Sequence, residues 1–251
     1  MAAAELTVVK IGGSVLNGLP AYTAAASFLA REAASGHTKL VAVVSAEYGH
    51  TDALAKEATA VAGQPDAAIQ DLLWSTGELR SVALLTLALK QAGVSATGLN
   101  AHETGLRVAQ AGGSIALNDI SLRASLARHT VVVVPGFLAT RRQQLVTLGR
   151  GGSDLSAVVL ASALRAGRCV LIKDVDGYFT DDPATNSDAE AIAAIDYARA
   201  IAMADDGCPL VQRDALIAAH NAKVPLVVRS FSGTGTLVTS NSGRAAVPAV
   251  A

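Results

Sequence analysis

Residues 6–14 read LTVVKIGGS, a run of mostly apolar residues that ends in a glycine pair. A short apolar strand, glycines and then an Ala-rich segment, here 21–34, are typical of strands and helices that alternate around a parallel sheet. The same order recurs along the chain. It predicts further strands at 40–45, 131–134, 169–172 and 224–229, and helices at 79–91, 154–164, 197–204 and 213–221. Asp196 is expected to be the N-cap of the helix at 197–204. The sequence therefore predicts an α/β fold, a three-layer sandwich with helices on both sides of a central, mostly parallel sheet.

The composition excludes several classes of protein. The chain has 251 residues, of which 51% are hydrophobic, so it can bury a core large enough to fold. Twenty Lys and Arg residues balance 21 Asp and Glu residues, which leaves no general field for nucleic acid or an anionic membrane. Apolar runs fall short of the ~18 residues of a membrane span, and the N-terminus lacks the pattern of a signal peptide. With only two cysteines, the sequence favours a soluble cytoplasmic protein.

A polar segment divides the chain into two parts. Residues 136–149 place Thr140, two arginines and two glutamines between glycines, which predicts a polar hairpin. No linker rich in Pro, Gly or Ser occurs elsewhere. We therefore expect a single domain, 1–251, whose halves are residues 1–145 and 146–251.

The glycine pair after the first strand is suited to an anion. Gly12 and Gly13 have no Cβ atoms, so the backbone amides of this turn, followed by Ser14, can approach a phosphate closely. Lys10 adds a full positive charge. Taken alone, the pair also fits an ordinary tight turn. It matches neither G-x-G-x-x-G nor G-x-x-x-x-G-K-[ST], which disfavours dinucleotide and Walker sites.

A second glycine loop, residues 147–154, reads TLGRGGSD. Arg150 beside Gly151 and Gly152 places a bidentate anion binder on a backbone that a ligand can approach closely. Asp154 lies at the start of a predicted helix, where a carboxylate is favoured. The plainer interpretation is that Asp154 is only an N-cap and Arg150 only a surface ion pair.

A third segment, residues 173–183, reads KDVDGYFTDDP and follows a predicted strand. Its carboxylates lie at the carboxyl end of that strand, where open α/β sheets bind ligands, and they suit a metal ion or a ribose. A solvated turn is the alternative, because Asp-Gly and Asp-Pro are common in turns.

Together, in this order and at these separations, the loops resemble the amino-acid kinase superfamily, most closely the aspartokinase catalytic domain. The resemblance covers nearly the whole chain. Residues 9–14 resemble the family's Lys-Phe-Gly-Gly-Thr/Ser loop, and residues 43–52 are similar to its Val-Ser-Ala-x-x-x-x-Thr-Asp loop. The other matching segments are 76–78, similar to a Gly-Glu helix start, 147–154 and 174–183.

The resemblance implies a role for each matched residue. Lys10 would contact the transferred phosphoryl group, and Asp154 would orient Lys10. The phosphate-binding residues would be Gly12, Gly13, Ser14, Gly151 and Gly152. The acceptor would meet Ser45, Thr51, Glu78, Arg150 and Ser153, with Glu78 at its α-amino group and Arg150 at a carboxylate. The nucleotide would meet Lys173, Asp174, Asp176, Phe179 and Asp182.

The implied reaction transfers the γ-phosphoryl group of ATP, with Mg²⁺, to a carboxylate, and the expected acceptor is aspartate. Such a carboxylate is already ionised at neutral pH, so no general base is needed. Glutamate, an N-acyl amino acid or a phosphonate are alternative acceptors, and a non-catalytic nucleotide-binding or anion-storage subunit is the alternative of another class. Residues 1–145 would bind the acceptor and 146–251 the nucleotide. The family also implies a homodimer or a higher homo-oligomer.

Several positions depart from the family pattern. Lys173 and Ala184 replace a Thr and an Arg, and residues 207–213 lack the lysine of the family's Gly-Ala-Lys-Val-Leu-His-Pro motif. Three outcomes are open: Lys173 or Arg213 compensates, the nucleotide is held differently, or turnover is weak. Glu47 and Tyr48 bring a carboxylate and a phenol to the acceptor side. Trp74 and Phe137 are expected in the core or the pocket wall, and His50 in the pocket. The chain ends where the family's kinase domain does, so regulatory ACT domains are expected to be absent.

Overall fold

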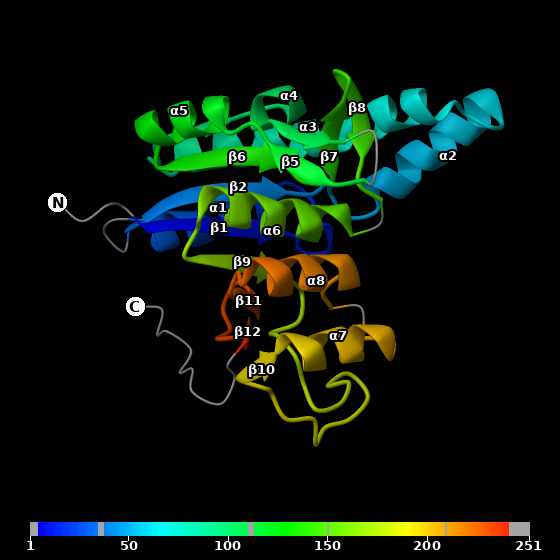
Figure 1. Cartoon of the computed structure of the whole chain (residues 1–251). Coiled ribbons are helices and arrows are strands. Elements are labelled where there is room, and N and C mark those ends of the chain that lie inside the picture. The colour runs from blue at the N-terminus through cyan, green and yellow to red at the C-terminus, as the bar shows by residue number, and fades with distance from the viewer. Residues whose placement is uncertain (1–4, 35–37, 110–112, 150, 209, 241–251) are drawn as a thin grey trace.

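The computed structural model describes residues 5–34, 38–109, 113–149, 151–208 and 210–240. Within these residues the main sheet has eight strands in the order β10-β12-β11-β9-β1-β2-β6-β3 (Figure 1). Their bounds are β1 Glu5–Ile11, β2 Thr38–Val44, β3 Ala96–Gly98, β6 Val131–Pro135, β9 Arg168–Ile172, β10 Ala194–Asp196, β11 Leu226–Arg229 and β12 Thr236–Thr239. Only the β11 and β12 pair is antiparallel. The predicted, mostly parallel sheet is confirmed.

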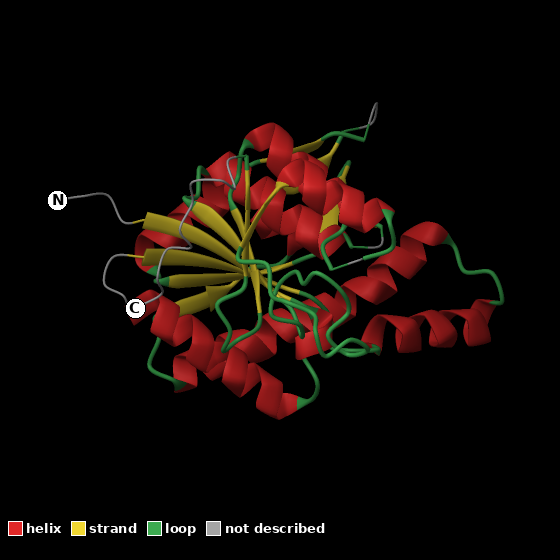
Figure 2. Ribbon diagram, turned by 90° about the horizontal axis from the view of Figure 1, so that it is seen from below, coloured by secondary structure: helices red, strands yellow, loops and turns green. Residues whose placement is uncertain are grey.

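Helices cover both faces of this sheet (Figures 1 and 2). Helices α1 Leu19–Ala34 and α3 Ala67–Gln91 pack on one face, and α6 Gly152–Leu164 and α8 Arg213–Ala222 pack on the other. The other described helices are α2 His50–Ala62, α4 Ala101–Thr104, α5 Ile120–Arg128, α7 Tyr197–Asp205 and the 3-10 helix η1 Gly13–Val15. The predicted three-layer arrangement is confirmed. The expected N-cap of α7 is confirmed too, because the Asp196 carboxylate accepts from the Arg199 amide at 2.7 Å.

Alternate residues of the central strands serve the two faces. In β1, Val8 packs with α6 and α8, whereas Val9 and Ile11 pack with α1 and α3. Every one of these side chains is fully buried, because both faces of a parallel sheet are covered. For that reason these strands read as unbroken apolar runs. Lys10 shares the side of Val8 and therefore points toward α6.

A smaller sheet has the order β5-β4-β7-β8 in the described residues. Its strands are β4 Leu106–Val108, β5 Ile115–Leu117, β7 Leu138–Arg141 and β8 Gln144–Thr147. Strands β7 and β8 form an antiparallel hairpin, which confirms the polar hairpin predicted at 136–149. Its turn residues, Arg142 and Gln143, both have positive φ angles, 48° and 69°, as a tight hairpin turn requires. The short strands β3, β4, β5, β10 and β12 were not predicted, because three or four residues carry too little periodicity.

Helices α2, α4 and α5 were not predicted at all, and helix α3 is much longer than predicted. It starts at Ala67, well before the predicted 79–91, because Asp66 caps it by accepting from the amides of Ala68 and Ile69. The expectation that a helix starts at Gly77 and Glu78 is therefore wrong. A Cβ atom at Gly77 would lie 2.9 Å from the His50 ring, so glycine lets α2 approach α3 here.

Helices α2 and α3 form a hairpin that extends beyond the sheet in Figure 2. Among the described helices, only α3 is long and apolar enough to cross a membrane by length and composition, a test that core helices also pass. Its residues Val82, Leu85 and Leu89 are buried in the core that α1 shares.

Candidate active site

The segments singled out in the sequence meet at the carboxyl ends of the central strands. Gly13 and Ser14 follow β1, Ser45 follows β2, and Lys173 follows β9. The amino end of α6 lies at the same edge of the sheet, because Asp154 in its first turn contacts both Lys10 and Lys173. Open α/β sheets bind their ligands at this edge.

Two lysines share one carboxylate at this edge. Lys10 Nζ lies 2.8 Å from Asp154 Oδ1, and Lys173 Nζ donates a hydrogen bond of 2.8 Å to Asp154 Oδ2. The three side chains are only 3–12% exposed. Gly151 holds the N-cap position of α6, so the interpretation of Asp154 as a mere N-cap is wrong. We call Lys10, Asp154 and Lys173 the lysine–aspartate cluster.

The lysine–aspartate cluster carries a net positive charge. Burial alone would raise the pKa of the Asp154 carboxyl, but the charges of Lys10 and Lys173 outweigh burial and hold this pKa at about 2. Burial, and then the charge of Lys10, lower the pKa of Lys173. Because two buried cations share one anion, an anionic ligand beside them would be stabilised.

A cavity of about 680 Å³ adjoins this cluster on the side of α2 and α3. Gly152 and Gln212 line it, and the backbone amide of Gln212 also donates to Asp154 Oδ2 at 3.5 Å. The residues that the sequence assigned to phosphate or acceptor and that line this cavity are Gly13, Ser14, Ser45, Thr51, Glu78, Gly151, Gly152 and Ser153. We call it the acceptor cavity. Arg150 lies outside the described residues.

Glu78 is the unusual group of the acceptor cavity. Its side chain is buried, Oε1 accepts from the Ala46 amide at 3.3 Å, and Oε2 has no hydrogen-bond partner among the described residues. Burial raises the pKa of Glu78 to about 7, although the hydrogen bond from Ala46 opposes the shift. A buried carboxylate with one unpaired oxygen suits a cationic ligand group such as an ammonium.

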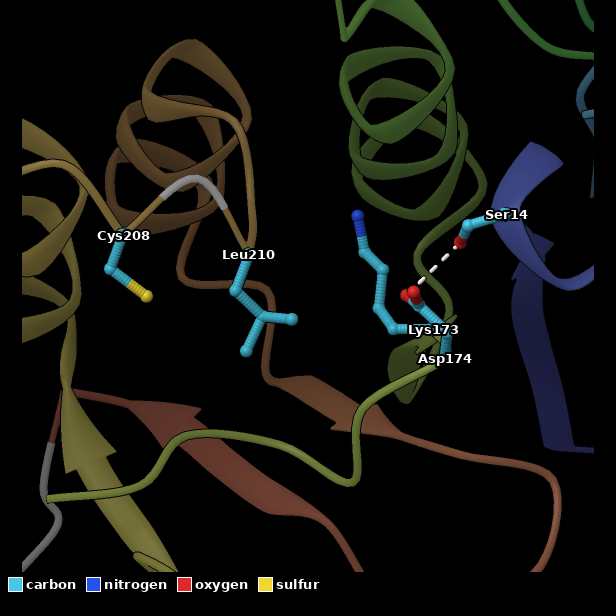
Figure 3. Close-up of a pocket in the computed structure, with 5 residues that line it drawn as sticks. All are labelled: Ser14, Lys173, Asp174, Cys208 and Leu210. Carbon is cyan, nitrogen blue, oxygen red and sulfur yellow. Dashed lines mark hydrogen bonds between the residues drawn. The ribbon is translucent and has the colours of Figure 1, made fainter. Parts of the chain in front are cut away.

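Two more cavities continue the site beyond Ser14. The first, of about 350 Å³, is lined by Ser14, Lys173, Asp174, Cys208 and Leu210, and Figure 3 shows Lys173 and Asp174 on one side of it. The Ser14 hydroxyl donates to Asp174 Oδ1 at 3.1 Å. Cys208 and Leu210 also line the next cavity, of about 410 Å³, which contains Phe179 and Asp182. Because each cavity shares a lining residue with the next, the three follow one another past the lysine–aspartate cluster.

A family model described as the amino acid kinase family matches residues 5–230. The chain belongs to the amino acid kinase family. Aspartokinase 2 of Bacillus subtilis (strain 168) is 36% identical over 243 residues, which are 94% of this chain and 59% of that protein. The aspartokinase of Geobacillus stearothermophilus is 34% identical over 93% of this chain and 58% of its own length. The chain thus spans about three-fifths of these curated relatives.

Solved structures show the same fold. The aspartate kinase from Synechocystis superposes with a TM-score of 0.84 at 33% identity, over 97% of this chain and 41% of that one. E. coli aspartokinase III in complex with aspartate and ADP gives a TM-score of 0.79 at 25% identity, over 94% of this chain and 65% of that one. UMP kinase from Bacillus anthracis, at 17% identity and a TM-score of 0.69, shares the fold alone.

In this amino acid kinase chain, two residues that were expected to contact phosphate or nucleotide are placed differently. The Gly12 amide donates to the Ile172 carbonyl at 3.3 Å, so it extends the sheet and is not free for a phosphate. A Cβ atom at Gly12 would lie 3.2 Å from Lys10 Nζ, so this glycine makes room for the lysine instead. Asp176 accepts from the amides of Ser230 (2.9 Å) and Gly235 (3.4 Å). It braces the loop between β11 and β12 and lines none of the three cavities, contrary to its expected contact with nucleotide.

The structure places the two candidate substitutes for the missing family lysine differently. Arg213 Nε forms an ion pair of 2.7 Å with Asp205, and both side chains are about half exposed. Lys173 lines the cavity beside Ser14. Of these two cations, Lys173 is the one that lines a cavity of the site.

Other residues enter the site without a sequence signal. Gln212 covers Gly151 so closely that a Cβ atom there would overlap the glutamine side chain, and Cys208 and Leu210 line the cavities beyond Ser14. Glu47 and Tyr48, by contrast, were expected on the acceptor side, and both line the acceptor cavity. Glu47 pairs with Arg80 there and accepts from the Gly18 amide.

Aromatic residues form one wall of the acceptor cavity. Trp74 and Phe137 both line it, which confirms their expected place in the pocket wall. His50 was expected to line it too, but it is not among the lining residues and packs beside Gly77 instead.

Proposed function

We propose that this chain transfers the γ-phosphoryl group of ATP to a carboxylate of aspartate and forms aspartyl phosphate. The observation that carries the proposal is the buried lysine–aspartate cluster, which lies between the acceptor cavity and the cavity that Lys173 lines. Glu78, whose Oε2 has no hydrogen-bond partner among the described residues, lines the acceptor cavity. Lys173 and Asp174 line the cavity next to Ser14. The aspartokinase relatives, at 36% and 34% identity, support aspartate as the acceptor.

The two halves of the chain would each bind one of the two substrates. In the half of residues 1–145, Glu78 would bind the acceptor ammonium, and Ser45 and Thr51 would surround the rest of it. In the half of residues 146–251, Phe179 and Asp182 would border the nucleoside, and Lys173 would contact its phosphates. The two anions would then meet beside Lys10.

Transfer needs positioning and charge neutralisation more than proton chemistry. An oxygen of the ionised acceptor carboxylate forms the new bond to phosphorus while the bond from phosphorus to the bridging oxygen of ADP breaks. Lys10 would stabilise the charge on the transferred oxygens, and Asp154 would hold Lys10 in place. Because the acceptor is already ionised, no group must remove a proton.

Magnesium fits the phosphate side of this proposal. Among the described residues, no group of three or more His, Cys, Asp or Glu side chains is arranged to hold a metal ion alone. Mg²⁺ in kinases, however, is held by one or two carboxylates together with substrate phosphates. Asp174 is the carboxylate of the cavity that Lys173 lines, so it would hold the ion with the nucleotide. The ion would neutralise phosphate charge there.

Coupled ADP release, together with hydroxamate trapping of the acyl phosphate, tests this function. We expect turnover to require both ATP and aspartate. Faster turnover on glutamate, an N-acyl amino acid or a phosphonate would replace aspartate as the acceptor. Nucleotide binding by calorimetry, with no turnover on any acceptor, would support the non-catalytic subunit instead. The homo-oligomer and the cytoplasmic location stay predictions from the sequence.

We expect the KM for aspartate to rise as the pH falls below about 7, by up to tenfold per pH unit. The pKa of Glu78 is raised to about 7, so below that pH the empty site holds a neutral carboxyl that does not pair with an ammonium. Initial rates between pH 5.5 and 8 measure this effect. The KM for ATP serves as the control. In Glu78→Gln the KM for aspartate should be high at every pH, and a flat profile in the unaltered protein would contradict the assignment.

A further inference from the structure

Trp74 presents an unpaired hydrogen-bond donor at the acceptor cavity. It precedes Glu78 by four residues on α3, so the two side chains lie on the same face of this helix. Both residues line the acceptor cavity. Trp74 Nε1 and Glu78 Oε2 are both buried, and neither has a hydrogen-bond partner among the described residues. Buried polar groups are nearly always paired in folded proteins, so an unpaired donor and an unpaired acceptor on residues that line one cavity call for a ligand with the complementary groups.

Phe137, which forms the cavity wall next to Trp74, has an unfavourable backbone conformation. Phe137 has a φ angle of +65°, which a residue with a bulky side chain rarely adopts. Hydrogen bonds fix it there: its amide donates to Ser156 Oγ at 3.1 Å, and its carbonyl accepts from the Leu148 amide at 2.8 Å. The Phe137 ring then lies against Trp74, with ring centroids 6.2 Å apart at an angle of 47°. Such backbone strain is concentrated at functional sites, and here it restricts how the indole can turn.

We propose that the Trp74 indole N–H donates a hydrogen bond to the α-carboxylate of an α-amino acid whose ammonium is bound by Glu78. This inference rests on the proposed function and deepens it, because it names the residue that selects the acceptor. The ammonium and the α-carboxylate of an amino acid sit on the same carbon. Side chains four residues apart on a helix start about 5–6 Å from each other, a separation that such a pair of groups can bridge.

The pairing has a consequence for the choice of acceptor. Once Trp74 and Glu78 hold the α-carbon groups of aspartate, its second carboxylate is free to face Gly13 and the lysine–aspartate cluster. An N-acyl amino acid has no ammonium for Glu78, and a simple phosphonate has neither group. The pair therefore selects free α-amino acids with a second acidic group.

The full chain contains a single tryptophan, so its fluorescence reports on this site alone. We expect aspartate to change the emission of Trp74 in the ADP-bound protein. Calorimetry then compares the unaltered protein with Trp74→Phe, which keeps an aromatic ring and removes the N–H. We expect the dissociation constant for aspartate to rise about tenfold or more, as for loss of a hydrogen bond to a charged group. The affinity for ADP and the melting temperature should not fall, because the N–H that is removed has no hydrogen-bond partner among the described residues.

A second ligand identifies the group that Trp74 contacts. The α-amide of aspartate keeps the ammonium and the side-chain carboxylate but loses the charge of the α-carboxylate. Its affinity should fall less than that of aspartate in Trp74→Phe, because its neutral amide oxygen accepts a weaker hydrogen bond from the indole N–H than a carboxylate does. Equal losses for both ligands would overturn the assignment to the α-carboxylate.

The remaining outcomes separate this inference from the proposed function. An unchanged affinity for aspartate in Trp74→Phe overturns the inference and leaves the function standing. Parallel losses of aspartate affinity, ADP affinity and melting temperature show a structural role for Trp74 and also overturn it. If the unaltered protein binds ADP but no acidic amino acid, by calorimetry or by Trp74 emission, the proposed function itself fails.

Discussion

Replacing Lys10 by Ala should lower kcat for aspartyl phosphate formation by about 100-fold or more. Lys10 pairs with Asp154 beside Gly12, and Lys173, which shares that carboxylate, lines the cavity next to Ser14, so the ammonium of Lys10 would stabilise charge on the transferred group. The fold should tolerate the change, because Asp154 keeps Lys173 as a partner. Hydroxamate trapping under saturating ATP and aspartate measures the rate.

The matched control for Lys10 is Lys90→Ala, which removes an exposed lysine from the last turn of α3. This variant should keep its full rate. Calorimetry with ADP separates a loss of chemistry from a loss of nucleotide affinity. A Lys10→Ala protein that forms acyl phosphate at the original rate would remove Lys10 from the catalytic machinery.

Asp154→Asn should lower the free energy of unfolding by about 3–5 kcal/mol, because it leaves two buried ammonium groups without a counter-charge. Lys10 and Lys173 both lie 2.8 Å from this carboxylate. The loss should be greater at pH 6 than at pH 9, since a buried lysine can release its proton more easily at the higher pH. Urea unfolding at both pH values measures the effect, and kcat should also fall because Lys10 loses its anchor.

A double variant tests the cause of this loss. In Lys173→Met, Asp154 still pairs with Lys10, and removing the carboxylate then leaves one buried cation instead of two. Asp154→Asn should therefore cost less stability in the Lys173→Met background than in the unaltered protein. An equal loss of stability in both backgrounds would show that the effect of Asp154→Asn does not come from leaving both lysines without a counter-charge.

The unaltered protein should also show the effect of Asp154 at low pH. The pKa of its carboxyl is about 2 in the folded state and near the ordinary value of 3.8 in the unfolded chain. As the pH falls, the unfolded state therefore binds a proton at this carboxyl before the folded state does. The stabilisation from the lysine–aspartate cluster is complete above pH 3.8 and is lost as the pH falls toward 2.

Structural features that depend on local backbone geometry were predicted well from the sequence. The strand that carries Lys10, the hairpin around Arg142 and the cap at Asp196 each depend on neighbours in the chain, and the structure contains all three. Helix α3 was predicted only in part. Its first half carries exposed apolar residues, such as Ile69 and Leu72, which obscure the pattern of a helix with one buried face.

The sequence by itself determined the alternating elements, the glycine loops and the residue types that can bind anions, because each depends on backbone preference and on the period of apolar residues. Only the tertiary structure decided which partners these residues meet. It gave Asp154 two lysines and turned Asp176 toward the loop after β11. It also left Trp74 Nε1 and Glu78 Oε2, on two residues that line one cavity, without hydrogen-bond partners in the described part of the chain. These contacts join segments far apart in the chain, and their geometry follows from how the layers pack rather than from any local preference.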